Sequence, residues 1–154
     1  MNKYFYPCDV LLPKSDFEKW AVVACDQYTS EPEYWQEVEK TIGDKPSAYN
    51  IILPEAYLQD DNSARIEKIN KTMNEYIENG VFNTFNDTMI YLEREVTGGK
   101  IRKGVVGLID LDEYSYDKNS TSLIRATEAT VLERIPPRVM IRKDASLELP
   151  HIML

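Results

Sequence analysis

The chain has 154 residues, of which 43% are hydrophobic and 29% charged, and its formal net charge is −8. This composition is that of a globular domain with a hydrophobic core and excludes a disordered chain. The acidic balance argues against a nucleic-acid-binding protein, because phosphate contacts require clustered lysine and arginine side chains. No apolar stretch reaches the ~20 residues that a membrane span needs, so we expect a soluble protein without a membrane partner.

The beginning of the chain predicts two short buried strands after an irregular start. Residues 1–20 contain Pro7 and Pro13, which interrupt regular elements. Residues 20–25, WAVVAC, are an apolar run typical of a strand buried on both faces. Residues 48–54, AYNIILP, predict a second strand of the same kind.

Two helices are predicted in the same part of the chain. The first runs from about residue 30, where Ser30 is a natural N-cap and Glu33 completes a capping box, and it ends at Gly43. The second covers residues 63–79, where apolar side chains recur at helical spacing.

In the second half of the chain, the spacing of apolar residues changes from that of a helix to that of strands. Residues 87–111 predict two strands joined at Gly98-Gly99, a strong signal for a β-hairpin, followed by a polar loop. A helix over residues 122–135 fits best next, stopped by Pro136-Pro137. Residues 138–143, RVMIRK, then predict a strand.

This order of elements favours a mixed α/β (α+β) domain, a mixed sheet with an antiparallel hairpin and helices packed on it. We expect a single domain over residues 1–154. The chain ends on the apolar sequence ELPHIML, whereas folded domains rarely end on exposed apolar residues. We therefore expect the N-terminal fragment of a longer protein.

Several common chemistries have no motif in this sequence. The patterns GxxxxGK[ST], GxGxxG, GxSxG and HExxH are absent, and His151 is the only histidine. Cys8 and Cys25 do not form a CxxC pair, which favours a reduced, cytoplasmic setting. The sequence predicts no zinc site or Ser-His-Asp triad. Catalysis would have to use carboxylates, hydroxyls, arginine and lysine.

The first candidate site is the polar corner that follows residues 20–25. Ligands of open α/β sheets collect beyond the carboxyl ends of strands. Asp26 is a candidate catalytic group that could hold Mg²⁺, and Gln27, Tyr28 and Thr29 are candidate ligand-binding residues. The structural alternative is an Asx turn at Asp26, a cap at Ser30 and packing of Tyr28.

The second candidate is the predicted helix over residues 122–135. Glu128 falls in the middle of its apolar stripe, where a carboxylate requires a cationic or metal partner. Residues 121–143 carry five basic and two acidic side chains, a local balance of +3. Glu128 would act as a general base or metal ligand, and the candidate ligand-binding residues around it are Arg125, Thr127, Thr130, Arg134 and Arg138. The structural alternative is a buried Glu–Arg pair that fastens the helix to the sheet.

Long phrases of the sequence resemble the family known as domain of unknown function 1015, among them KWAVVACDQYTSEPEYW, YNIILPE, GVVGLIDLDEY, IRATEATVLERIPPRV and LELPHIML. The resemblance extends over nearly the whole chain, although family members are considerably longer, and it implies no generally established activity. The family is in turn distantly similar to the ParB and sulfiredoxin-like superfamily, some members of which phosphorylate free serine using a nucleotide.

The leading hypothesis is Mg²⁺-dependent phosphoryl transfer from ATP or ADP to a small hydroxylated metabolite such as serine. Asp26 and Glu128 would be metal or base groups, and Arg134 and Arg138 would contact phosphate. Two alternatives stay open. One is a non-catalytic module that binds a small anion or a partner protein, and the other is a structural N-terminal half of an enzyme whose site lies elsewhere.

Overall fold

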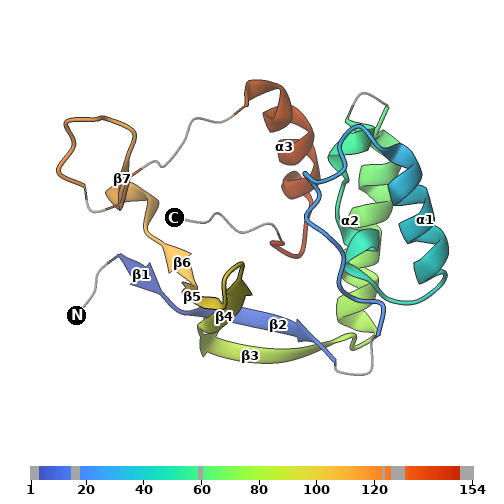
Figure 1. The fold of residues 1–154 in the computed structure, drawn as a ribbon, viewed down its shortest axis with the longest axis horizontal. Coiled ribbons are helices and arrows are strands. Elements are labelled where there is room, and N and C mark those ends of the chain that lie inside the picture. Colours follow the sequence, from blue (N-terminus) through green and yellow to red (C-terminus); the bar gives the residue numbers. More distant parts are fainter. Residues whose placement is uncertain (1–3, 15–17, 59–60, 123, 126–130, 150–154) are drawn as a thin grey trace. The chain divides into compact units, whose positions relative to one another are not determined.

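The computed structural model describes residues 4–14, 18–58, 61–122, 124–125 and 131–149 (Figure 1). The chain forms two compact units. The strand unit comprises residues 1–12, 84–129 and 151–154, and the helical unit comprises residues 13–83 and 130–150. The prediction of one folded domain concerns how these units combine, and it stays a prediction.

In its described residues the helical unit has three helices and three short 3-10 turns. Its helices are α1 (Pro32–Ile42), α2 (Ser63–Glu78) and α3 (Ile135–Lys143). The 3-10 turns are η1 (Ala48–Ile51), η2 (Glu55–Tyr57) and η4 (Leu132–Arg134). Helix α2 contacts both η1 and α3.

Two clusters of buried side chains hold this unit together. Positions 66, 69, 73 and 76 of α2 are buried and repeat at helical spacing, which confirms the predicted helix. The first cluster comprises Ile51, Leu53, Ile69, Met73, Tyr76 and Val81. The second is built on Trp35, Ile42 and Tyr49, and Trp35 is fully buried. Helix α1 therefore packs through Trp35 and Ile42.

The predicted N-cap of α1 is wrong. Glu31, not Ser30, is the N-cap, and it makes no side-chain capping hydrogen bond. The chain enters the helix through a turn in which the Glu31 N–H donates to the Tyr28 carbonyl at 3.2 Å. Ser30 lies inside that turn. Gly43, at φ 59°, ends the helix as predicted.

The two predicted strands of this unit are wrong as secondary structure. Residues 20–24 are irregular, residues 48–51 form η1, and residues 55–57 form η2. The Ser47 side chain accepts a hydrogen bond from the Tyr49 N–H, a local contact that favours a turn over a ladder. Burial was predicted correctly for the second run, since Tyr49, Ile51 and Leu53 are all buried, but not for the first, since residues 20–25 are half-buried or exposed. A short apolar run does not by itself distinguish a strand from other buried backbone.

The predicted helix over residues 122–135 and the strand after it are also wrong where the structure describes them. Ile124 and Arg125 form strand β8, and Val131 is extended, with φ −74° and ψ 112°. Pro136 and Pro137 open α3 instead of stopping a helix. Proline is tolerated in a first helical turn because the N–H groups there have no partner within the helix.

The described strands pair in twos. Strand β1 (Phe5–Tyr6) pairs antiparallel with β6 (Leu108–Ile109), and β2 (Cys8–Pro13) pairs with β3 (Phe82–Thr88). The start of the chain is therefore less irregular than predicted.

The rest of the strand unit contains the predicted hairpin. Strands β4 (Ile90–Val96) and β5 (Lys100–Val106) pair antiparallel around Gly98-Gly99. After the 3-10 turn η3 (Leu111–Glu113), β7 (Tyr114–Ser115) pairs parallel with β8. The mixed α/β class with an antiparallel hairpin is confirmed. None of the described helices is long and apolar enough to cross a membrane.

Candidate functional site

A buried carboxylate lies at the start of η2. Glu55 follows Pro54, and its side chain is only 5% exposed. Its N–H donates to the carbonyl of Cys25 at 2.8 Å, which fixes η2 beside the polar corner at residues 24–27. A buried carboxylate requires cationic partners to offset its lost hydration.

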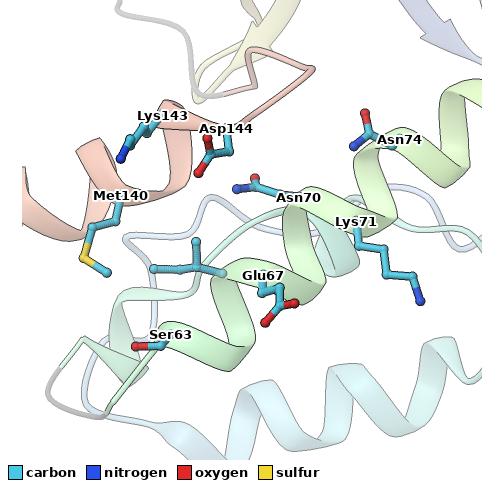
Figure 2. A pocket seen from close by; sticks show the side chains of 9 residues that line it. Ser63, Glu67, Asn70, Lys71, Asn74, Met140, Lys143 and Asp144 are labelled. Atoms are coloured by element: carbon cyan, nitrogen blue, oxygen red, sulfur yellow. The ribbon is translucent and has the colours of Figure 1, made fainter.

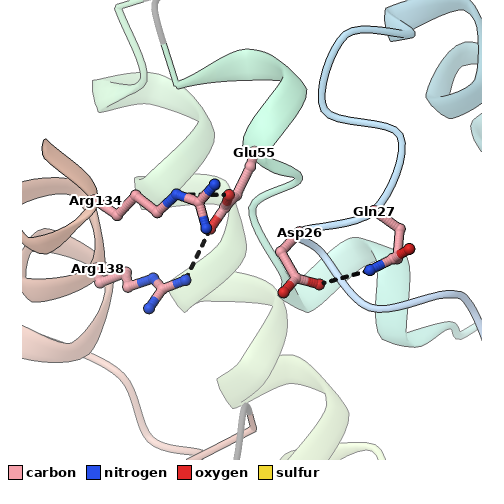
Figure 3. Close-up of polar contacts among 5 residues, drawn as sticks. All are labelled: Asp26, Gln27, Glu55, Arg134 and Arg138. Atoms are coloured by element: carbon pink, nitrogen blue, oxygen red, sulfur yellow. Dashed lines mark hydrogen bonds and ion pairs between the residues drawn. The ribbon is translucent and has the colours of Figure 1, made fainter. Parts of the chain in front are cut away.

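Two arginines supply that compensation (Figure 3). Arg138 Nη2 donates to Glu55 Oε1 at 2.8 Å, and Arg134 Nε lies 3.2 Å from Oε2. The contact with Oε2 is an ion pair without an aligned hydrogen bond. The arginines stand four positions apart, across the turn where α3 begins, so they reach the same side of the chain. One buried carboxylate thus orients two guanidinium groups.

The same two guanidinium groups are open to solvent. The Arg134 side chain is 39% exposed and the Arg138 side chain 50% exposed. A guanidinium carries several N–H donors in a planar fork that matches carboxylate and phosphate oxygens, and the contacts with Glu55 engage only part of them. Pro136 and Pro137 remove two N–H groups from the start of α3. Anion binding here would therefore depend on the arginines and not on backbone amides.

The structure places the Asp26 corner next to this cluster. Asp26 is exposed and accepts a hydrogen bond from Gln27 Nε2 at 3.4 Å. The corner closes through the Gln27 N–H, which donates to the Ala24 carbonyl at 3.0 Å. Burial raises the pKa of the Cys25 thiol, the charges of Glu55 and Asp26 raise it further, and Arg138 lowers it. Asp26 and Arg138 thus act on the same thiol, so the Asp26 corner and Arg138 of the second sequence candidate lie in one region.

The backbone of this corner is strained at Tyr28. Its φ is 51°, in the left-handed region that a tyrosine rarely adopts. The Tyr28 ring stacks on Tyr34, with centroids 3.9 Å apart and planes 16° from parallel. The packing of Tyr28 expected under the structural alternative is therefore present, whereas the cap at Ser30 is not. Thr29 is exposed beside it.

The structure describes only some of the residues predicted around Glu128. Glu128, Thr127 and Thr130 lie outside the described residues, and Arg125 lies in β8. The apolar stripe that singled out Glu128 required one continuous helix over residues 122–135, whereas Ile124 and Arg125 form β8 and Val131 is extended. Among the described residues, the carboxylate that faces Arg134 and Arg138 is Glu55.

Sequence reasoning missed Glu55. A signal was present, because this glutamate directly follows the apolar run AYNIILP. Across the described ranges, no group of three or more histidine, cysteine, aspartate and glutamate side chains is arranged to hold a metal ion.

Comparisons with known proteins support the family resemblance. No curated protein and no solved structure matches the chain. The sequence model of the family described as "Protein of unknown function (DUF1015)" matches residues 5–154. Since this match covers nearly the whole sequence, the chain belongs to the DUF1015 family.

Proposed function

We propose that Arg134 and Arg138 bind a small molecule that carries a phosphate or carboxylate group. The observation that supports this proposal is the pair of half-exposed guanidinium groups held by one carboxylate that is 5% exposed. Two arginines fixed in advance lose little side-chain entropy when they bind an oxyanion, and each can donate two parallel hydrogen bonds.

The finer proposal is Mg²⁺-dependent phosphoryl transfer from ATP or ADP to a small hydroxylated metabolite such as serine. Phosphoryl transfer requires cations around the phosphate and a carboxylate for the metal ion. Asp26 is an exposed carboxylate in the same region as Arg138 and suits the second role. Glu128, which lies outside the described residues, stays a candidate base in this proposal.

A second candidate function is structural. Glu55 lies 83 positions before Arg138, so its ion pairs fasten α3 to the rest of the helical unit. Under this alternative the arginines have no ligand, and the buried ion pair is the reason for their presence. Binding measurements separate the two candidates.

The experiment is calorimetric titration of the chain with phosphate, sulfate, phosphoserine, ADP and ATP. Arg134→Ala and Arg138→Ala should each weaken phosphate binding by about tenfold or more, because each removes charged hydrogen bonds. Arg102→Ala, an exposed arginine of β5, removes the same charge elsewhere and should leave the affinity unchanged. Equal affinities in all four proteins would leave the structural candidate.

Asp26→Asn tests the metal-dependent part of the proposal. Without Mg²⁺ this variant should bind ATP more tightly, because a negative charge next to the arginines is gone. With Mg²⁺ it should bind ATP more weakly than the wild type, because the carboxylate ligand is lost. If ATP binding by both proteins responds equally to Mg²⁺, Asp26 holds no metal ion. Formation of phosphoserine from serine is the direct assay of transfer.

A further inference from the structure

Tyr28 presents an aromatic ring to solvent from the corner that carries Asp26. The ring stacks on Tyr34, with centroids 3.9 Å apart, yet 42% of Tyr28 remains exposed. Because Tyr34 covers one face of this ring, the exposed surface lies on the opposite face and on the edge. The opposite face is therefore open to a further flat ring.

Buried aromatic side chains hold this stack in place. Tyr34 meets Trp35 edge-on, with centroids 5.4 Å apart, and Trp35 in turn stacks on Tyr49. Trp35 is fully buried and Tyr49 is 6% exposed. At φ 51°, the backbone of Tyr28 has a conformation that glycine or asparagine adopts at lower cost. The corner thus keeps an aromatic ring in spite of backbone strain, on a support that is ordered before any ligand binds.

The open ring of Tyr28 lies near the two arginines of the proposed anion site, and η2 connects them. Glu55, at the start of η2, pairs with both arginines and donates its N–H to the Cys25 carbonyl. At the end of η2, the Tyr57 hydroxyl donates to the carbonyl of Pro32, in the first turn of α1, at 3.4 Å. Tyr28 follows Cys25 by three positions, so their Cα atoms are at most about 11 Å apart. The ribose and phosphate chain of a nucleotide spans a comparable length.

A groove between α2 and α3 also borders the helix that carries Arg138 (Figure 2). None of the described residues that line this groove is aromatic. Its two carboxylates, Glu67 and Asp144, are matched by the two lysines Lys71 and Lys143. The lining of the groove therefore selects neither a flat ring nor a charged group, whereas the open face of a tyrosine selects a flat ring.

We infer that the open face of Tyr28 stacks on the base of a nucleotide whose phosphate groups contact Arg134 and Arg138. This inference rests on the proposed function, because it identifies the remainder of the molecule whose anionic end the arginines bind. Bases stack on aromatic side chains in many nucleic-acid-binding proteins, and every base has a π-face. The ligand class is therefore a nucleotide and not inorganic phosphate or phosphoserine.

The test is calorimetric titration of the chain with ATP and with inorganic tripolyphosphate, which has phosphate groups but no base. Tyr28→Ala should weaken ATP binding about fivefold or more and leave tripolyphosphate binding unchanged, because only ATP has a ring to stack. Tyr28→Asn should give the same result. Asparagine tolerates φ 51°, so this variant removes the ring without changing the backbone preference of the corner.

Two control variants keep or remove a ring elsewhere. Tyr28→Phe should bind ATP like the wild type, because stacking requires the ring and not the hydroxyl. Tyr116→Ala removes a tyrosine of the strand unit that is 69% exposed, and it should bind both ligands like the wild type.

Arg134→Ala separates this inference from the proposed function, because it should weaken the binding of both ligands. If it does so and the two ring-removing variants of Tyr28 bind ATP like the wild type, the anion site stands and the stacking is overturned. If Arg134→Ala weakens neither ligand, the proposed function fails and this inference fails with it. Equal losses of ATP and tripolyphosphate binding in Tyr28→Ala and Tyr28→Asn would also overturn the stacking, since Tyr28 would then only shape the corner. If Tyr28→Ala did not fold, Tyr28→Asn would decide.

Discussion

Arg138 Nη2 lies 2.8 Å from Glu55 Oε1, and the two residues are 83 positions apart in the sequence. The contact joins α3 to η2 within the helical unit, after the chain has passed through residues 84–129 of the strand unit. A carboxylate that is 5% exposed is thereby neutralised by side chains from a distant segment. The anchoring of α3 and the geometry of the candidate anion site thus depend on the same contact.

Glu55→Gln should destabilise the chain by about 1–3 kcal/mol, because glutamine keeps the shape but loses both charged contacts. The half-exposed arginines regain water, which places the expected value toward the lower end. Urea unfolding measures the change. Glu37→Gln is the control, since its ion pair with Lys40 joins side chains that are 67% and 78% exposed, and it should cost less than about 0.5 kcal/mol. Equal effects of the two variants would mean that Glu55 does not anchor α3.

The reactivity of Cys25 should report on the charges of the site. In a Cys8→Ser background, the alkylation rate should have a midpoint above the ordinary thiol pKa of 9.0, because burial, Glu55 and Asp26 all disfavour the thiolate. Glu55→Gln should lower this midpoint and Arg138→Ala should raise it. The midpoint in Glu55→Gln should stay above the ordinary value, since burial is the largest cause. A midpoint that neither variant moves would place Cys25 outside the influence of the cluster.

The same raised pKa makes a prediction for stability. The folded state favours the neutral thiol of Cys25, so its contribution to stability is fully present below the ordinary value of 9.0. The contribution is lost as the pH rises from that value through the folded-state pKa. Cys25→Ser should therefore flatten the fall in the free energy of unfolding at alkaline pH. An unchanged slope would contradict the assignment.

Tyr76→Phe should destabilise the helical unit by about 1–3 kcal/mol, because it leaves the buried Ser47 N–H without a hydrogen-bond acceptor. The Tyr76 hydroxyl accepts hydrogen bonds from the Ser47 N–H at 3.0 Å and from Asn50 Nδ2 at 2.9 Å, and Ser47 is fully buried. Thermal unfolding followed by circular dichroism measures the loss. Tyr57→Phe is the control, since that hydroxyl makes a longer contact of 3.4 Å with the Pro32 carbonyl in a half-buried position. The prediction fails if Tyr57→Phe costs as much as Tyr76→Phe.

Gly107→Ala should disrupt the pairing of β1 with β6 in the strand unit. A Cβ atom at this position would lie 2.6 Å from the Tyr6 carbonyl and 2.9 Å from the Phe5 ring, so the strands must move apart, at a cost of about 1–3 kcal/mol. Amide hydrogen exchange at Phe5 and Tyr6 should accelerate. Gly104→Ala, whose Cβ would meet Leu92 at an ordinary 4.0 Å, should leave exchange unchanged. If Phe5 and Tyr6 stayed protected from exchange in Gly107→Ala, β1 and β6 would lie farther apart than these distances indicate.

The elements that could be predicted from the sequence have signals of short range. The apolar spacing within α2, the glycine after α1 and the pair Gly98-Gly99 each act over a few residues, and each prediction is confirmed. The family could be recognised from the order of long phrases and is confirmed as well.

Other segments had local signals that suit two structures. Pro136-Pro137 can end one helix or begin the next, and here the pair begins α3. The runs at residues 20–25 and 48–54 are apolar enough for strands, but Ser47 directs the second run into a turn. In the second run the buried positions followed from the sequence, whereas residues 20–25 are half-buried or exposed. The backbone conformation of these segments was decided by the surrounding structure.

The sequence by itself determined the α/β class, two helices, the hairpin, the family and the candidacy of Asp26, Arg134 and Arg138. Only the tertiary structure decided that Glu55 is the carboxylate that Arg134 and Arg138 face. The reason is physical. A buried charge takes its partner from whatever cation the fold brings within a few ångströms, and no local pattern encodes a contact between residues 83 positions apart.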